Sequence, residues 1–323
     1  MNILKASNLK VYYSTTKGAV RAVDGVDFDV DEGSSVGLAG ESGCGKTTLG
    51  LSLLKLLPSN GKIEGGSVLF KGVDIYSLSE REFREKIRWK LISMVFQGAM
   101  NALNPVFKVE AQIAEALMLH ETVSKKEAVE VARDLLRKVD IDPSMGSQYP
   151  HEFSGGMRQR AMVAMALACN PQLVIADEPT TALDVIVQKQ LMDLLRRLKR
   201  EMNLSLIVIS HDISVIAELC DHLNIMYAGR IVERAEINEL FESPLHHYTF
   251  GLISTFPTVL DKERRSKFEF IPGAPPNLLN PPEGCRFHPR CPAATEICRH
   301  NPPPPMRKIT ESHFVACHHP RGV

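Results

Sequence analysis

The chain has 323 residues, 44% of them hydrophobic and 24% charged, and its 38 basic and 38 acidic residues cancel to a formal net charge of zero. The length suits one large domain with an appendage, or two modest domains, and a buried core can form. The charge balance argues against nucleic-acid binding, which usually brings a basic excess. No signal-peptide core and no apolar run near the ~18 residues of a membrane helix is seen. We therefore expect a cytosolic protein without a nucleic-acid partner.

The first part of the chain divides into a strand-rich region and a helical region. Up to about residue 95, short strands and turns surround one helix, expected at 47–57 after a strand at 33–40. The middle of the chain is helical in pattern. The helix expected at 124–141 opens with a capping box formed by Ser124 and Glu127.

Beyond residue 170, apolar runs alternate with helical stretches. The apolar runs 173–177 and 204–210 flank a helical pattern at 185–202. Continuous apolar strands separated by helices indicate a parallel sheet covered on both faces. Residues 223–235 then predict a hairpin that turns at Ala228–Gly229.

A phosphate-binding pattern lies between the first predicted strand and helix. Residues Gly40–Thr47, "GESGCGKT", fit G-x-x-x-x-G-K-[ST]. The glycines let the backbone curl so that successive N–H groups face one anion. Lys46 brings a charge to the β- and γ-phosphates, Thr47 can ligate Mg²⁺, and the helix presents its positive end. A chance glycine-rich turn is the alternative, which the strand before and the helix after disfavour.

Polar side chains end three apolar strands. Asp177 can hold Mg²⁺ through water at the tip of the strand 173–177, and Glu178 can polarise the water that attacks the γ-phosphate. A solvated turn is the alternative for this acidic pair. His211 and Gln97 end two further strands, and neither is diagnostic by itself.

A second anion site is predicted more than a hundred residues after the first. The segment "FSGGMRQR" (153–160) opens a helix of small residues with Ser154, Gly155 and Gly156. Exposed N–H groups and a helix dipole there would bind an anion without a lysine. The chain thus carries two half-sites for phosphate.

Together, in this order, these motifs resemble the ATP-binding cassette (ABC) ATPases over about residues 1–265. The resemblance implies that Glu178 and His211 are catalytic. Phe153 and Met157 replace the commonest residues beside the family's signature, and the Met157 change is peripheral because the anion-binding backbone lies at Ser154–Gly156. The implied nucleotide-binding residues are Tyr13, or its neighbour Tyr12, with Gly40, Ser42, Gly43, Cys44, Gly45, Lys46, Thr47, Thr48 and Gln97. The implied magnesium residues are Thr47, Gln97 and Asp177.

The resemblance also implies a head-to-tail dimer that binds ATP and Mg²⁺. Ser154, Gly155 and Gly156 would act on the partner's ATP, and Asp184 would lie at the dimer interface. ATP closes such a dimer and hydrolysis opens it, which drives two membrane permease subunits. An extracytoplasmic solute-binding protein would take part indirectly. The partner chain is either a different, related subunit or a second copy, and the protein would sit peripherally at the cytoplasmic face of the membrane.

Three further segments resemble one branch, the oligopeptide/dipeptide/nickel importer group. They are "FQGAMNALNP" (96–105), "SPLHHYTFGLISTFP" (243–257), and the tail that contains "PGAPPNL" (272–278) and "CRFHPRCPAATEIC" (285–298). The resemblance implies uptake of di- or oligopeptides. Import of nickel or oligosaccharides, or a soluble ABC ATPase outside transport, are the alternatives.

The tail holds twelve of the chain's twenty prolines and cannot form a regular helical core. We expect its four cysteines, Cys285, Cys291, Cys298 and Cys317, to fix it. Cysteines of the cytosol are more often metal ligands or redox groups than disulfides. The Cys291–Pro292 pair, the missing C-x₂₋₄-C knuckles and the branch resemblance favour a [4Fe–4S] cluster. Zinc, with His288, His300, His318 or His319 as spare ligands, and free thiols or a disulfide remain open.

The expected fold is therefore α/β. It has a P-loop ATPase core with a mostly parallel sheet, an N-terminal antiparallel β subdomain and a helical subdomain at about 98–160. The nucleotide-binding domain would cover residues 1–265. A proline-rich, metal-binding extension would cover residues 266–323.

Overall fold

The computed structural model describes residues 1–98, 102–254 and 271–322, and the chain divides into two compact units. None of the helices described in these ranges is long and apolar enough to cross a membrane. The first unit comprises Met1–Leu4, Val30–Ser35 and Leu69–Ile209. The second comprises Lys5–Asp29, Val36–Val68 and Ser210–Val323.

The first unit contains three parallel, fully buried strands. They are β6 (Ile92–Val95), β7 (Leu173–Asp177) and β8 (Ser205–Ile209), with β7 in the middle. Their residues are almost all apolar because a strand of a covered parallel sheet has no face in water. The parallel pairing expected from residues 173–177 and 204–210 is thus confirmed.

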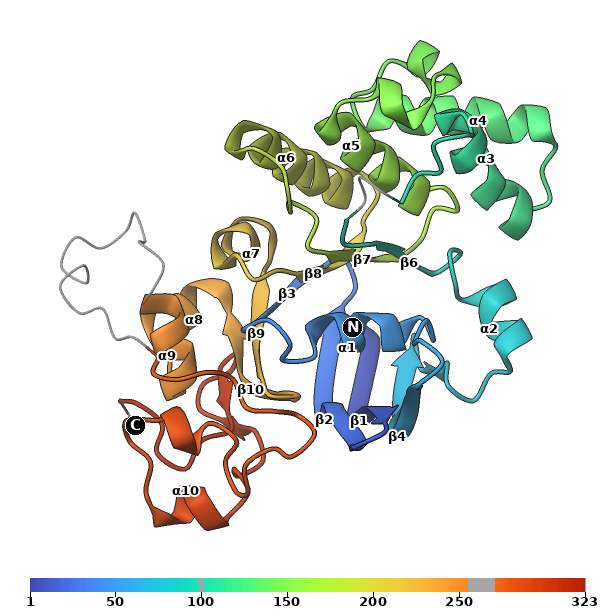
Figure 1. The fold of residues 1–323 in the computed structure, drawn as a ribbon. Helices are drawn as coiled ribbons and strands as arrows, with labels where there is room; N and C mark the ends of the chain where they lie inside the picture. The colour runs from blue at the N-terminus through green and yellow to red at the C-terminus, as the bar shows by residue number, and fades with distance from the viewer. Residues whose placement is uncertain (99–101, 255–270, 323) are drawn as a thin grey trace. The chain divides into compact units, whose positions relative to one another are not determined.

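The first unit also contains helices, of which α3, α4 and α5 lie together in Figure 1. The capping box of α4 is formed: Ser124 N–H donates to the Glu127 carboxylate at 2.8 Å, and Glu127 N–H donates to Ser124 Oγ at 3.3 Å. A helix before residue 95 that we did not predict, α2, opens with a similar box at Ser79 and Glu82. The helices are α2 (Glu80–Lys86), α3 (Val109–His120), α4 (Lys125–Lys138), α5 (Gly155–Ala166) and α6 (Val185–Glu201), with 3-10 turns at Pro143–Ser147 and Pro150–Glu152.

The second unit contains most of three long neighbouring strands and a separate run of pairings. The long strands are β1 (Asn2–Thr15), β2 (Gly18–Asp31) and β4 (Gly61–Phe70). The last two residues of β4, Leu69 and Phe70, belong to the first unit and pair antiparallel there with β5 (Val73–Asp74). In the other run, β3 pairs parallel with β9, β9 antiparallel with β10, and β12 joins β10 to β11. These strands are β3 (Ser35–Ala39), β9 (His222–Tyr227), β10 (Arg230–Glu236), β11 (Arg307–Lys308) and β12 (Phe314–Val315).

Short helices complete the second unit. Helix α1 is shorter than the helix expected at 47–57, because the chain leaves helical geometry at Leu54. The hairpin turn is confirmed at Ala228–Gly229, and both residues have positive φ. The helices are α1 (Lys46–Leu53), α7 (Ile213–Leu219), α8 (Ile237–Glu242), α9 (His247–Ser254) and α10 (Glu296–His300), with a 3-10 turn at His288–Arg290.

The end of the chain is joined to this unit through a buried carboxylate. Glu233 of β10 is fully buried and accepts hydrogen bonds from Leu245 N–H at 2.7 Å and His246 N–H at 2.8 Å. His313, just before β12, lies 2.6 Å from the same carboxylate through Nε2. One side chain therefore fixes both α9 and the terminal strand. The expected domain boundary between residues 265 and 266 lies outside the described residues.

Replacing this carboxylate by an amide, Glu233→Gln, should destabilise the protein. The amide nitrogen would face an N–H donor in a site closed to water, so we expect a loss of about 1–3 kcal/mol in unfolding free energy. Denaturant unfolding measures it. The matched control is Glu236→Gln, an exposed residue of the same strand, which should change stability by no more than about 0.5 kcal/mol. Equal effects in both variants would contradict the anchoring role of Glu233.

Candidate nucleotide site and cysteine pocket

The phosphate loop belongs to the second unit and joins β3 to α1. Gly40 and Gly45 both have positive φ, +151° and +110°. A Cβ at Gly40 would overlap the carbonyl oxygen of Met226, and one at Gly45 would overlap that of Ala22. Backbone from two other strands therefore packs directly against the loop, and only glycine fits at these positions.

Polar groups of the loop form hydrogen bonds with one another and with the β9–β10 turn. Lys46 is 7% exposed, and its Nζ donates to the carbonyl oxygens of Gly40 at 2.6 Å and Glu41 at 3.1 Å. The Cys44 carbonyl accepts from Gly229 N–H at 2.8 Å. Burial raises the pKa of the Cys44 thiol. The lysine thus lies inside the curl of the loop, at the start of α1.

The two candidate tyrosines make different contacts. The Tyr12 hydroxyl donates to Asp24 at 2.6 Å, whereas the Tyr13 hydroxyl lies 3.1 Å from Thr48 Oγ1, on the first turn of α1. Burial and the Asp24 carboxylate raise the pKa of Tyr12 to about 12. Tyr13 is therefore the tyrosine attached to the phosphate-loop helix.

In the first unit, two acidic residues end β7. Asp177 is 1% exposed and pairs in register with Ile209 of β8. Glu178 follows with φ of +50°, and its N–H donates to the Ile209 carbonyl at 2.8 Å. A left-handed conformation costs a residue with a Cβ roughly 1–2 kcal/mol, so the surrounding bonds must enforce it. Thr181 Oγ1 donates to the Glu178 carboxylate at 3.4 Å.

The predicted signature residues begin α5 of the same unit. Ser154 is the N-cap, and its Oγ accepts from Met157 N–H at 3.2 Å. Gly156 lies against α6, because a Cβ there would come within 2.6 Å of Val187. Asp184 caps α6 by accepting from Val187 N–H at 2.9 Å. The caps orient both helix starts and account structurally for Ser154 and Asp184.

The remaining two predicted residues are exposed. Gln97 follows β6 in the first unit, and His211 precedes α7 in the second. The predicted site residues thus fall into two sets. The first unit holds Gln97, Ser154–Gly156, Asp177, Glu178 and Asp184, and the second holds Tyr13, the loop Gly40–Thr48, His211 and the four tail cysteines.

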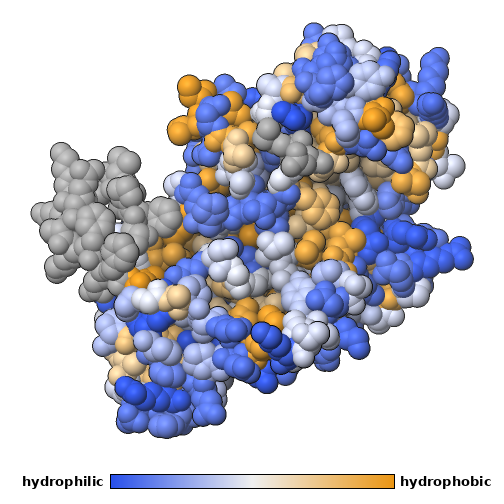
Figure 2. Space-filling model, in the orientation of Figure 1, coloured by the Kyte–Doolittle hydropathy of each residue, from blue (hydrophilic) through white to orange (hydrophobic). Residues whose placement is uncertain are grey.

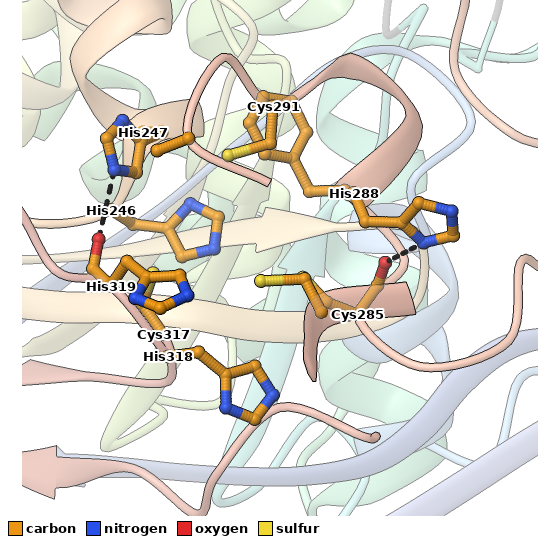
Figure 3. Close-up of a pocket in the computed structure, with 11 residues that line it drawn as sticks. His246, His247, Cys285, His288, Cys291, Cys317, His318 and His319 are labelled. Carbon is orange, nitrogen blue, oxygen red and sulfur yellow. Dashed lines mark hydrogen bonds between the residues drawn. The ribbon is translucent and has the colours of Figure 1, made fainter. Parts of the chain in front are cut away.

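The four tail cysteines line one pocket in the second unit. Figure 3 shows the thiols of Cys285 and Cys291 turned toward the same space. Cys298 belongs to α10, and Cys317 follows β12. Among the described residues, no three His, Cys, Asp or Glu side chains are arranged to hold a metal ion. The pocket is thus a space shared by four thiols and not a formed single-ion site.

Burial affects the protonation of three of these thiols. It raises the pKa of Cys285, that of Cys291 to about 11 and that of Cys317 to about 12. The neighbouring thiols add to the rise, since a second thiolate in the pocket would repel the first. The protein by itself therefore favours the protonated form of Cys285, Cys291 and Cys317.

Histidines complete the pocket wall, and the sequence identified only some of them. Of the histidines named as spare zinc ligands, His288, His318 and His319 line the pocket, whereas His300 contacts Glu296 at 3.2 Å. His288 turns away from the cysteines toward the Cys285 carbonyl at 3.0 Å (Figure 3). His318 Nε2 is buried and has no hydrogen-bond partner among the described residues.

Two wall histidines were not predicted. His246 and His247 come from the segment before α9 and its first residue, and both line the pocket. Burial lowers the pKa of His246 to about 4, and its Nδ1 accepts from Tyr248 N–H at 3.0 Å. The only signal in the sequence was the pair "HH" within a segment that resembles the importer branch.

Comparison with known proteins identifies the family. Residues 23–181 match the family described as ABC transporter, and residues 232–298 match the one described as oligopeptide/dipeptide transporter, C-terminal region. The chain therefore belongs to the ABC transporter ATPases, and its fold is a P-loop ABC ATPase fold with a mixed sheet and helices. Within this family it carries the C-terminal region of the oligopeptide/dipeptide branch.

Individual relatives agree along nearly the whole chain. The oligopeptide transport ATP-binding protein OppD of Escherichia coli K12 is 47% identical, over 98% of this chain and 93% of its own. OppD of Bacillus subtilis 168 is 43% identical over 97% and 87%. A solved dimeric ATP-binding cassette in a post-hydrolysis state, bound to ADP and phosphate, has a TM-score of 0.65 at 27% identity, covering 72% of this chain and 98% of that one.

The loop geometry predicts unequal effects of two glycine substitutions. Gly45→Ala combines a positive φ with overlap of a carbonyl oxygen, and should abolish ADP binding. Gly43 has φ of +78°, but a Cβ there meets no described atom within 4 Å. Gly43→Ala should therefore cost only about 1–2 kcal/mol of stability and retain ADP binding. Calorimetric titration and thermal unfolding measure both, and stronger ADP binding by Gly45→Ala than by Gly43→Ala would contradict the geometry.

Proposed function

We propose that this chain is the ATP-hydrolysing subunit of an importer that takes up di- or oligopeptides through membrane partner subunits. The observation that carries the proposal is a folded phosphate loop in a chain that resembles oligopeptide transport ATPases over 98% of its length. ATP hydrolysis is the expected activity of the family, and the protein would work peripherally at the cytoplasmic face of the membrane.

The loop Gly40–Thr48 would hold the phosphates of ATP. Lys46, already inside the curl of the loop, would contact the β- and γ-phosphates as a point charge. Tyr13 is the better candidate for stacking on adenine, because its hydroxyl reaches Thr48 while Tyr12 is engaged by Asp24.

Magnesium and water would be handled by residues from strand ends. Thr47, Gln97 and Asp177 would hold Mg²⁺, which neutralises charge that develops on the phosphates. Glu178 would polarise the attacking water, and its backbone bond to Ile209 fixes the start of its side chain. His211 would contact the γ-phosphate region.

The proposed dimer places Ser154–Gly156 on the ATP of a partner chain. Asp184 would lie in the interface, and Val185 and Ile186 directly after it are 80% and 72% exposed. Figure 2 shows hydrophobic side chains at the surface over α6 and over the helices α3–α5. Val106 and Phe107, two exposed hydrophobic residues just before α3, would face the permease subunits.

The cysteine pocket would hold a [4Fe–4S] cluster, with Cys285, Cys291, Cys298 and Cys317 as ligands. Four thiolates are the usual ligand set of such clusters, and these four line one pocket. Zinc with three or four of these ligands is the alternative. A bound cluster would act as a structural crosslink for the proline-rich tail.

Glu178→Gln should separate nucleotide binding from hydrolysis. The amide cannot take a proton from water, so we expect turnover to fall by about 10²–10⁴-fold while ATP is retained in a closed dimer. Steady-state ATPase assays and gel filtration with ATP measure both effects. The control is Glu152→Gln, an exposed residue of the same unit. Undiminished hydrolysis by Glu178→Gln would disprove the catalytic assignment.

Anaerobically purified protein should be brown, with about four irons and four sulfides per chain. Iron, sulfide and zinc analysis together with visible absorption test this expectation. Cys291→Ser should lose the absorption, while Cys169→Ser, which alters a cysteine outside the pocket, should keep it. One colourless zinc per chain would instead establish the alternative, and a metal-free wild type would refute both.

A further inference from the structure

Glu41, the second residue of the phosphate loop, is held at three of its groups. Its N–H donates to the Tyr248 hydroxyl at 2.8 Å, and its carbonyl accepts from Lys46 Nζ at 3.1 Å. Its carboxylate receives two hydrogen bonds from Arg290, Nη1 to Oε2 at 2.6 Å and Nη2 to Oε1 at 2.8 Å. The motif G-x-x-x-x-G-K-[ST] leaves this position unspecified, so nothing in it assigns Glu41 a role.

Arg290 is itself held by hydrogen bonds to groups other than Glu41. Its side chain is 7% exposed, whereas that of Glu41 is 25% exposed. Nε donates to the Pro272 carbonyl at 2.7 Å, and Nη1 lies 3.3 Å from the Tyr227 hydroxyl. A guanidinium with its donors engaged in this way cannot swing to another acceptor, so it presents a rigid two-pronged fork to Glu41.

A second arginine of the same segment makes a parallel connection. Arg286 is 6% exposed and pairs with Asp24, and it also donates to the Ala228 carbonyl in the β9–β10 turn. Burial by itself would raise the pKa of Asp24, but the Tyr12 hydroxyl and Arg286 outweigh it and lower the pKa. Through these two arginines, the segment between Cys285 and Cys291 therefore contacts Asp24, the β9–β10 turn and Glu41 of the phosphate loop.

We propose that Arg290 is a positioning residue for nucleotide binding, which acts through the Glu41 carboxylate on the phosphate loop. The proposal rests on the proposed role of Gly40–Thr47 in holding nucleotide phosphates. Arg290 fixes the direction of the Glu41 side chain and thereby the carbonyl that Lys46 contacts. It also neutralises a carboxylate that would otherwise repel an anionic ligand of the same loop.

Arg290→Gln should weaken Mg²⁺–ADP binding by about tenfold, because contacts of this kind in one hydrogen-bonded network are coupled. Arg290→Lys, which keeps the charge but not the fork, should fall between this variant and the wild type. The matched control is Arg299→Gln, an exposed arginine of the same extension that contacts only Glu296 at 3.4 Å among the ion pairs described. It should bind as the wild type does. Titration calorimetry gives the affinities, and thermal unfolding without nucleotide gives the stability.

The double variant Glu41→Gln, Arg290→Gln separates the charge effect from a loss of packing. Removing the carboxylate as well should restore part of the affinity lost in Arg290→Gln, because the unpaired negative charge is gone. A lower melting temperature with unchanged ADP affinity in Arg290→Gln and Arg290→Lys would show a purely structural role and overturn the proposal. If Lys46→Ala bound ADP with the affinity of the wild type, that result would instead refute the proposed role of the loop in holding nucleotide phosphates.

Discussion

The conformation of the phosphate loop in the second unit depends on the close packing of neighbouring backbone against it. Carbonyl groups of Ala22 and Met226 occupy the space where side chains of Gly45 and Gly40 would lie. Gly229 adds a backbone hydrogen bond to Cys44 from the β9–β10 turn. The curl of the loop is therefore imposed by neighbouring strands as much as by its own sequence. A loop fixed in this way needs little reorganisation to receive an anion.

The proline-rich tail obtains its order from a few specific contacts. Phe287 packs edge-on against Tyr227 and Tyr248, with ring centroids 5.1 and 5.5 Å apart. These three rings form an apolar contact between the tail and the elements β9 and α9. Glu233 and the pairing of β12 with β10 fix the other end of the tail. A segment unsuited to helices can thus be fixed without a core of its own.

Sequence patterns predicted the elements that local rules determine. Burial on both faces made β7 and β8 recognisable, and the capping box located the start of α4. The loop glycines followed from a motif whose spacing reflects backbone geometry. The contacts of Glu41 could not be predicted, because its partner Arg290 lies 249 positions away and their pairing depends on the tertiary fold. The place of His246 in the pocket wall could not be predicted for the same reason.

The choice of an ion pair between the tail and the loop has a physical consequence. Removing two charges from water is costly, so apolar side chains of similar size could join these segments with at least equal stability. Apolar contacts, however, do not fix a direction. The fork of Arg290 on the Glu41 carboxylate permits one relative orientation, and Tyr227 and Pro272 hold the fork itself. Arg290 is followed directly by Cys291, so a single residue connects the cysteine pocket to the phosphate loop.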